Sequence, residues 1–281
     1  MLNEVIGHTE VKVKLKSLIK NIPKVLLFSG PEGVGKKFTA FRFINEINNG
    51  YLTDKYFTHP DIYFLKPDTN TFKLDLVDKL KENVSTKPFE LSQKYFILDD
   101  IHLMNKESSN ACLKIFEDCP DHCIFILLAE DSSKVLDTIL SRSLKIEFNP
   151  IPNLKDYYPN LTDLQLDLMG GCLGRRELVL DKNITGTYNE VLQFVKNINN
   201  KNYNDIIDWC LNKRDVDINY LTDLILVSLK DISKDPEKTF LADVVLNEVK
   251  NFKSKLTYSV NLQNHFRYAL ISARRNLQIF N

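Results

Sequence analysis

The sequence predicts an α/β domain, in which helices flank a parallel sheet, followed by an all-α region. Across the first 150 residues, short apolar runs alternate with longer amphipathic stretches. Beyond them no strand-like run recurs, and apolar residues return at helical spacing instead. Regular strand–helix alternation is typical of a doubly wound sheet, and the regular spacing makes a mixed α+β domain the poorer account.

Five apolar runs are the expected strands. Each is short and carries few polar residues, as parallel strands do when both of their faces are buried. A helix is expected after Asn105, a good N-cap residue, because Ala111, Cys112, Ile115 and Phe116 then fall on one face. The expected strands are 24–29, 61–66, 94–100, 123–130 and 144–148.

The stretch "NPIPN" at 149–153 breaks this pattern with two prolines and predicts a domain boundary. Residues 161–180 then predict one helix, a Gly-Gly break and a second helix. From about Tyr188 the pattern is helical to the end. Apolar residues recur at threes and fours in 220–232, 240–252 and 265–274.

The composition excludes several classes of protein. Lys+Arg and Asp+Glu both number 37, and this balance argues against a chain-wide electrostatic grip on nucleic acid or on an anionic membrane. No apolar run approaches the roughly 20 residues that span a bilayer. The first 20 residues lack the apolar core of a signal peptide, so a cytoplasmic protein is expected. The odd number of cysteines, five, favours reduced thiols.

The stretch "GPEGVGKK" resembles the phosphate-binding loop G-x-x-x-x-G-K-[S/T], with an expected strand before it and a helix after it. The glycines Gly30, Gly33 and Gly35 let backbone N–H groups face phosphate oxygens, and Lys36 is placed to reach the outer phosphates. The last position departs from the pattern, because Lys37 replaces the hydroxyl that ligates Mg²⁺. An ammonium group has no free lone pair and would repel the metal. ATP binding therefore stays open, and Mg²⁺ placement is disfavoured.

The run "YFILDD" ends in Asp99 and Asp100, which is the Walker B pattern of an apolar strand followed by acid. Asp99 would hold Mg²⁺ through a water molecule. The next acid usually orients the attacking water and is often a glutamate, whereas Asp100 is one methylene shorter. Misplacing a catalytic group by roughly 1 Å can cost on the order of 10²-fold in rate. Lys37 and Asp100 thus both disfavour hydrolysis.

In their order along the chain, several motifs resemble the bacterial clamp-loader subunits of the AAA+ family, and above all the delta-prime class of DNA polymerase III. The resemblance is dense over about residues 1–180, and near the C-terminus "VNLQNHFRYALISAR" is similar to the last collar helix of the family. The motifs are "VIGH", "GPEGVGKK", "HPDI", "ILDDIHLMNKESSNACLKIFEDCPDHCIFILLAEDSSKVLDTILSRS" and "GGCLGRREL".

This resemblance implies a P-loop AAA+ domain over 1–150, a helical lid over 151–187 and a helical collar over 188–281. It also implies a hetero-pentameric ring with gamma/tau-like and delta-like subunits, which opens the sliding clamp and places it on primed DNA, with no membrane involved. Clamp loaders as a class hold the duplex by its phosphates. The basic stretch 12–20 is a candidate for such a contact, but the solvated face of an amphipathic helix is the favoured interpretation.

Individual residues take roles through the resemblance. Arg142 matches an arginine finger that is supplied in trans to ATP on a neighbouring subunit and stabilises the transferring phosphoryl group. Arg175 matches the sensor 2 arginine of the lid. Ile6 and Gly7, within "VIGH", match residues that line the adenine side of the pocket.

Departures from the family pattern bear on activity. Ser143 replaces the cysteine of a Ser-Arg-Cys segment, which leaves the finger usable. At the sensor 1 position Ala129 and Glu130 stand where the family has Thr or Asn, a further departure that disfavours hydrolysis. Most bacterial relatives carry a four-cysteine zinc module, but residues 45–61 contain no cysteine, so no zinc is expected.

Three functions compete on this basis. The favoured one is a stator, a delta-prime-like subunit that donates Arg142 while its own pocket hydrolyses poorly. The main rival is an ATP-hydrolysing motor subunit of the gamma/tau type, because Lys36 and Asp99 are retained. The third is an AAA+ protein outside replication, which would need a DNA-reading module, and the sequence has no helix-turn-helix signature.

Overall fold

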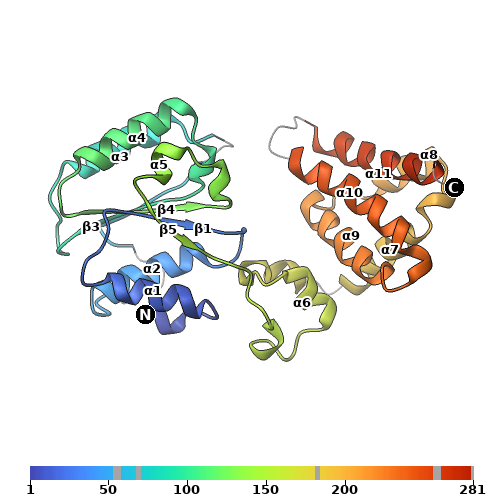
Figure 1. Ribbon diagram of the computed structural model, residues 1–281, viewed down its shortest axis with the longest axis horizontal. Coiled ribbons are helices and arrows are strands. Elements are labelled where there is room, and N and C mark those ends of the chain that lie inside the picture. Colours follow the sequence, from blue (N-terminus) through green and yellow to red (C-terminus); the bar gives the residue numbers. More distant parts are fainter. Residues whose placement is uncertain (53–57, 68–70, 181–183, 256–260, 280–281) are drawn as a thin grey trace. The chain divides into compact units, whose positions relative to one another are not determined.

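The computed structural model describes residues 1–52, 58–67, 71–180, 184–255 and 261–279 (Figure 1). The chain divides into two compact units. The first unit holds Met1–Asn160 with Gly170–Gly174, and the second holds Leu161–Met169 with Arg175–Asn281. The three-domain division at residues 150 and 187 stays a prediction. Residues 53–57, within the stretch expected to lack a zinc module, lie outside the described residues.

The first unit is built on five parallel strands in the order β2-β3-β4-β1-β5. All five expected strands are confirmed, and with them the α/β class. The mostly apolar sequences of the inner strands reflect burial on both faces, since β1, β3 and β4 are buried along their whole length. The bounds are β1 Val25–Ser29, β2 Ile62–Leu65, β3 Lys94–Leu98, β4 Cys123–Ala129 and β5 Leu144–Glu147.

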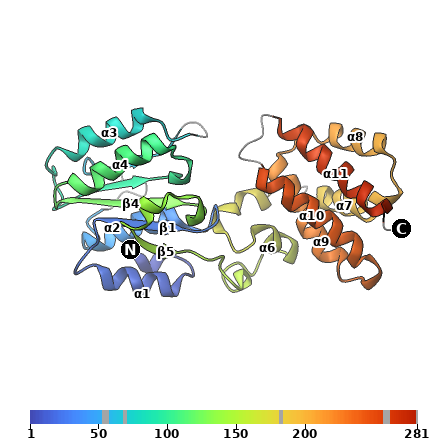
Figure 2. The same cartoon turned by 45° about the horizontal axis from the view of Figure 1, so that its top comes forward.

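Helices cover both faces of this sheet (Figures 1 and 2). α1 and α2 pack on one face, where alternate β1 residues such as Phe28 meet Leu15 and Phe43. α3 and α4 pack on the other face, where Leu27 lies in a cluster with Leu80 and Phe116. The helices are α1 Thr9–Leu18, α2 Lys36–Ile47, α3 Leu74–Val84, α4 Lys106–Asp118 and α5 Asp137–Leu140.

Two helix predictions in this unit are confirmed. The side chain of Asn105 caps α4 by accepting a hydrogen bond of 2.8 Å from the Ser108 backbone N–H. α1 is amphipathic, with Val11 and Leu15 buried and with Lys14 and Lys16 exposed. The basic stretch therefore forms the outer face of a helix.

The second unit is helical throughout its described part. α7 packs on α9, and α10 packs on both α9 and α11. Helical periodicity in the sequence is thereby confirmed for α9, α10 and α11. The elements are α6 Asp163–Met169, α7 Ile184–Lys196, α8 Tyr203–Asn212, α9 Ile218–Ile232, α10 Thr239–Lys255 and α11 Leu262–Ile279.

The second helix expected within residues 161–180 is wrong. Only two three-residue 3₁₀ turns follow α6, at Leu173–Arg175 and Glu177–Val179. Gly170 and Gly171 adopt φ values of +55° and +80°, which end the helix. The Gly174 backbone N–H then bonds outside the segment, so the turn does not propagate into a helix.

All five cysteines are free and buried, as the odd count predicts. Among the described residues, every helix is too short or too polar to cross a lipid bilayer.

Candidate nucleotide site

The glycine loop connects β1 to α2, as its sequence predicts. A Cβ atom at Gly30 would lie 2.2 Å from the Phe148 carbonyl oxygen, so no larger residue fits there. Gly35 has φ +107° with open space around it, so it is the backbone conformation rather than crowding that requires glycine. The loop therefore delivers the chain into the N-terminus of a 12-residue helix, an arrangement that suits anions.

Lys36 lies inside this loop, with only 9% of its surface exposed. Its ammonium group donates hydrogen bonds to the carbonyl oxygens of Gly30, at 2.5 Å, and Pro31, at 2.9 Å. Burial lowers the pKa of Lys36, and nearby carboxylates act in the opposite direction. Those carboxylates belong to Glu130, Asp99 and Asp100. The loop lysine and the predicted Walker B acids are thus brought together.

The two acids follow β3 directly. The Asp99 backbone N–H donates to the Leu65 carbonyl oxygen at 2.8 Å, which extends the sheet by one bond. Asp100 adopts φ +53°, and its N–H donates to Asp99 Oδ1 at 3.1 Å. Burial raises the pKa of Asp99, and the neighbouring Asp100 charge raises it further. Two lysines, Lys66 and Lys37, act against this rise.

Lys37 extends towards β2, where its Nζ lies 3.7 Å from the ring centroid of Phe64. On the same strand end, the Lys66 ammonium group pairs with the Asp100 carboxylate at 3.5 Å. We call these groups the lysine–carboxylate cluster. It consists of Lys36, Lys37, Lys66, Asp99, Asp100 and Glu130, three cations and three anions.

This donor set does not fit a Mg²⁺ ion. The position that would supply a hydroxyl ligand is Lys37, whose ammonium group cannot ligate. The acid after Asp99 is already paired with Lys66. Mg²⁺ demands near-ideal octahedral oxygen coordination, and two nearby ammonium groups oppose it by charge.

A cavity of about 200 Å³ lies beside the loop. Its lining includes the predicted adenine-side residue Ile6, together with His8, Val34, Phe38 and Leu173. The Nε2 atom of His8 lies 2.9 Å from the Val34 carbonyl oxygen and ties the "VIGH" segment to the loop. Gly7, with φ +65°, makes the preceding turn. The cavity is mostly apolar, as a purine base requires.

The "GGCLG" segment also reaches the loop. The Gly174 backbone N–H donates to the Gly33 carbonyl oxygen at 2.8 Å, and a Cβ at Gly174 would lie 2.8 Å from Gly33 Cα. Arg175 comes next in the chain but belongs to the second unit, where its guanidinium donates to Asp223 at 3.0 Å. Lys253 donates to the same carboxylate at 2.6 Å. The sensor 2 role of Arg175 stays a prediction.

Arg142 and the glycine loop lie at opposite ends of the parallel strands. β1 and β5 are parallel, with Leu26 opposite Leu144. Arg142, which precedes β5, therefore lies at the end of the sheet where β1 begins. At about 3.3 Å per residue, Arg142 and Gly30 are roughly 20 Å apart along the strands. The Arg142 side chain is 45% exposed, and its Nε donates to Glu117 at the end of α4 at 2.5 Å.

Ser143 donates its hydroxyl to the Ile139 carbonyl oxygen at 2.6 Å and closes the turn that carries Arg142. The replacement of cysteine by serine at this position is therefore accommodated within the backbone turn. The arginine remains free of the sheet core and points to a part of the surface away from its own glycine loop.

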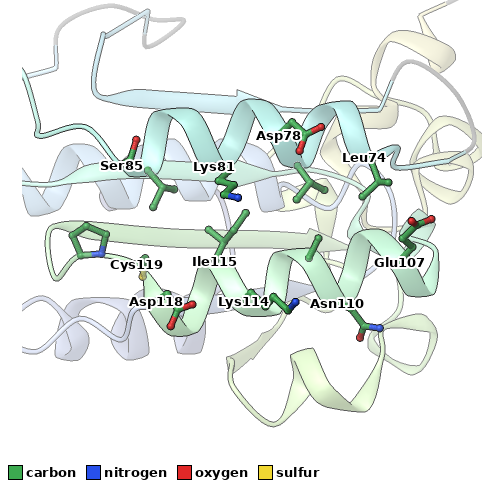
Figure 3. A pocket seen from close by; sticks show the side chains of 14 residues that line it. Leu74, Asp78, Lys81, Ser85, Glu107, Asn110, Lys114, Ile115, Asp118 and Cys119 are labelled. Atoms are coloured by element: carbon green, nitrogen blue, oxygen red, sulfur yellow. The ribbon is translucent and has the colours of Figure 1, made fainter.

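A larger cavity, of about 820 Å³, lies between α3 and α4 (Figure 3). Its lining mixes apolar residues such as Val77 and Ile115 with both Lys81 and Asp118. None of the predicted site residues lines it. Despite its smaller volume, the cavity beside the glycine loop is the better nucleotide site, because it lies next to backbone N–H groups and Lys36.

Sequence reasoning missed two members of the cluster. Lys66 follows β2 as Asp99 follows β3, and neighbouring parallel strands end at the same edge, so strand order is the signal that would have found it. Glu130 stands out in the sequence only as a departure at sensor 1, but it directly follows β4, which lies between β3 and β1.

Comparison with known proteins shows the family of the first unit. Residues 7–152, just over half of the 281-residue chain, match the family described as "DNA polymerase III, delta subunit". The chain is 28% identical over 163 residues to "DNA polymerase III subunit tau" of Bacillus subtilis, which covers 53% of this chain and 29% of the relative. It is 32% identical over 151 residues to "Replication factor C small subunit" of Methanosarcina acetivorans, with 52% and 43% covered.

The matched region thus spans less than half of these two relatives' length. A crystal structure of a DNA polymerase III gamma subunit-related protein from Thermotoga maritima shares the fold, with a TM-score of 0.58 and 13% identity over 94% of this chain and 98% of that chain. Together with the glycine loop, the acidic strand end and the parallel sheet, the family match shows that the chain belongs to the DNA polymerase III delta subunit family, among the clamp-loader AAA+ proteins.

Proposed function

We propose that this chain is a stator of a clamp loader, of the delta-prime type, which donates Arg142 in trans to ATP on a neighbouring subunit while its own pocket hydrolyses poorly. One observation carries the proposal. Arg142 is exposed at the end of the strands opposite to the glycine loop, while the pocket at that loop lacks a Mg²⁺ ligand set. A residue roughly 20 Å from its own loop serves a second molecule rather than its own nucleotide.

The proposed partners follow from this role. They are gamma/tau-like and delta-like subunits in a hetero-pentameric ring, and through the ring the sliding clamp and primed DNA. In this role the first 150 residues act as the AAA+ domain, residues 151–187 as the lid with Arg175 as sensor 2, and residues 188–281 as the collar. The relatives named for DNA polymerase III and replication factor C support the assignment.

The test replaces Arg142 in the reconstituted assembly. Arg142→Ala should leave ring formation intact, because the side chain is half exposed and pairs only at the surface of its own unit. ATPase and clamp loading should fall, since an arginine finger given in trans contributes about 10³–10⁵ in rate in well-studied phosphoryl-transfer systems. Size-exclusion chromatography and steady-state ATPase assays measure the two effects.

Arg142→Lys is the matched control, because it keeps the charge and loses the planar fork that contacts phosphoryl oxygens. It should recover little of the lost rate. Unchanged ATPase in the Arg142→Ala assembly would exclude the finger role.

A motor role of the gamma/tau type is the second candidate, and the approach of Lys36 to Asp99 is the observation in its favour. The two roles differ in turnover by the purified chain. As a stator it should hydrolyse Mg·ATP poorly, at a rate that Lys36→Ala leaves little changed. Turnover that Lys36→Ala abolishes would assign the chain to the motor class.

A further inference from the structure

We propose that the pocket takes the polyphosphate of a nucleotide without a divalent cation, with the ammonium groups of Lys37 and Lys66 standing where a metal would neutralise charge. The inference rests on the proposed function to the extent that the pocket retains a nucleotide. It adds the form of ligand that is recognised, a metal-free nucleoside di- or triphosphate.

The charge of the lysine–carboxylate cluster carries the first step. In the loop pattern with a hydroxyl at its last position, one lysine faces the acids and a metal supplies the remaining positive charge. Here two further lysines do so. Lys66 pairs with Asp100, and the charges of Lys37 and Lys66 both reach Asp99. Asp100 is therefore already paired with a lysine, and Asp99 lies near two lysine charges, before any ion arrives.

The position of Lys37 carries the second step. It is the second residue of α2, so its backbone lies at the helix end where the phosphates would bind. Its side chain crosses to Phe64 on β2 and brings a positive charge to the edge where β3 ends in Asp99. Lysine is a well-established phosphate ligand as a point charge. The same group thus repels Mg²⁺ and attracts a free polyphosphate.

The remaining parts of a nucleotide site are present. The glycines of the loop keep backbone N–H groups clear, and the cavity of about 200 Å³ beside Ile6 and Phe38 offers an apolar wall to a base. Lys36 is held by two carbonyl oxygens of the loop, bonds that a phosphate oxygen can replace. The glycine loop, the helix N-terminus, the loop lysine and an apolar wall are thus present, whereas the residue types that ligate Mg²⁺ are incomplete.

The experiment titrates ADP carrying a fluorescent label on the ribose into the full chain, once with MgCl₂ and once with EDTA, at equal ionic strength. The wild-type dissociation constant should differ by less than about twofold between the buffers, whereas Lys37→Thr, which restores the hydroxyl, should bind about tenfold more tightly with Mg²⁺ than with EDTA. Lys20→Thr is the control, because it removes the same charge from an exposed turn after α1.

Two results would overturn the inference. Wild-type binding that weakens about tenfold or more in EDTA would mean that the pocket requires the metal. Absence of binding in both buffers would mean that the pocket takes no nucleotide. Neither result alters the ATPase of the Arg142→Ala assembly, so failure here and failure of the stator role are distinguishable.

Discussion

The buried carboxylate of Asp61 explains the "HPDI" motif at the level of a single residue. It is fully buried, and it accepts backbone N–H bonds from Phe89 at 2.6 Å, Glu90 at 2.7 Å and Leu91 at 2.9 Å. Burial raises the pKa of Asp61, but the three bonds outweigh it, and the pKa lies below its ordinary value. One carboxylate thereby fixes the loop that leads into β3.

Asp61→Asn should destabilise the chain, because an amide oxygen replaces a charged acceptor of three N–H groups and the amide N–H₂ faces donors. We expect a loss of about 1–3 kcal/mol at neutral pH. The carboxylate contribution is complete above the ordinary Asp pKa of about 4 and is lost as pH falls through the lowered folded-state pKa. The stability difference between wild type and variant should therefore be constant near neutrality and shrink on acidification.

Urea unfolding followed over a pH series measures this difference. Asp215→Asn, at an exposed position in the turn between α8 and α9, is the control and should track wild type within about 0.5 kcal/mol. A wild-type–variant difference that stays constant through the acid range would contradict the role assigned to the Asp61 charge.

At the scale of elements, α4 connects several features of the first unit. It begins beside the acidic strand end with an Asn105 cap and buries Cys112 and Phe116 against the sheet. Its last turn carries Glu117, which accepts a hydrogen bond from Arg142. The helix therefore runs from the end of the strands that carries the nucleotide site to the end that carries Arg142.

Two identical substitutions on α4 should have different effects. Asn105→Ala removes the acceptor for the Ser108 N–H and should cost about 1 kcal/mol. Asn110 is exposed on α4 and lines the cavity in Figure 3. Asn110→Ala should be neutral or slightly stabilising, since alanine is the better helix former by up to about 0.7 kcal/mol. Urea unfolding of both variants at neutral pH measures the pair, and equal losses would exclude the cap as the cause.

Much of the element pattern could be predicted from the sequence, because parallel strands such as β4 are apolar along their whole length and caps such as Asn105 act locally. The second helix after α6 could not. Its sequence pattern is typical of a helix, but the Gly174 backbone N–H donates to the carbonyl oxygen of Gly33, about 140 residues away in the chain. A local sequence pattern carries no information about such a contact.

The same distinction holds in the site. Lys36 follows β1 and Asp99 follows β3, on either side of β4, and the two motifs could be expected to meet. The pairing of Lys66 with Asp100 depends on β2 lying beside β3, and that of Arg142 with Glu117 on how α4 crosses the sheet. Strand order and helix direction are properties of the fold, which residue spacing alone leaves open.

At the scale of the whole molecule, each unit has its own apolar core and its own ion pairs. In the first unit the sheet separates two apolar clusters. Leu26 and Phe28 of β1 belong to one cluster, and Val25 and Leu27 belong to the other. In the second unit Asp223 forms ion pairs with both Arg175 and Lys253, and Asp167 forms one with Lys230. The chain passes between the units three times, at Asn160–Leu161, at Met169–Gly170 and at Gly174–Arg175. The last crossing lies next to the glycine that bonds the nucleotide loop.

The placement of Arg142 and the glycine loop at opposite ends of parallel strands gives the first unit a polarity. Under the proposed role, one end gives a catalytic group and the other end receives one, so copies of this domain associate head to tail. Head-to-tail contacts make rings when the rotation closes and open filaments when it does not. A member whose giving end is intact and whose receiving end hydrolyses poorly has only one productive neighbour, and such a member naturally marks the terminus of the series.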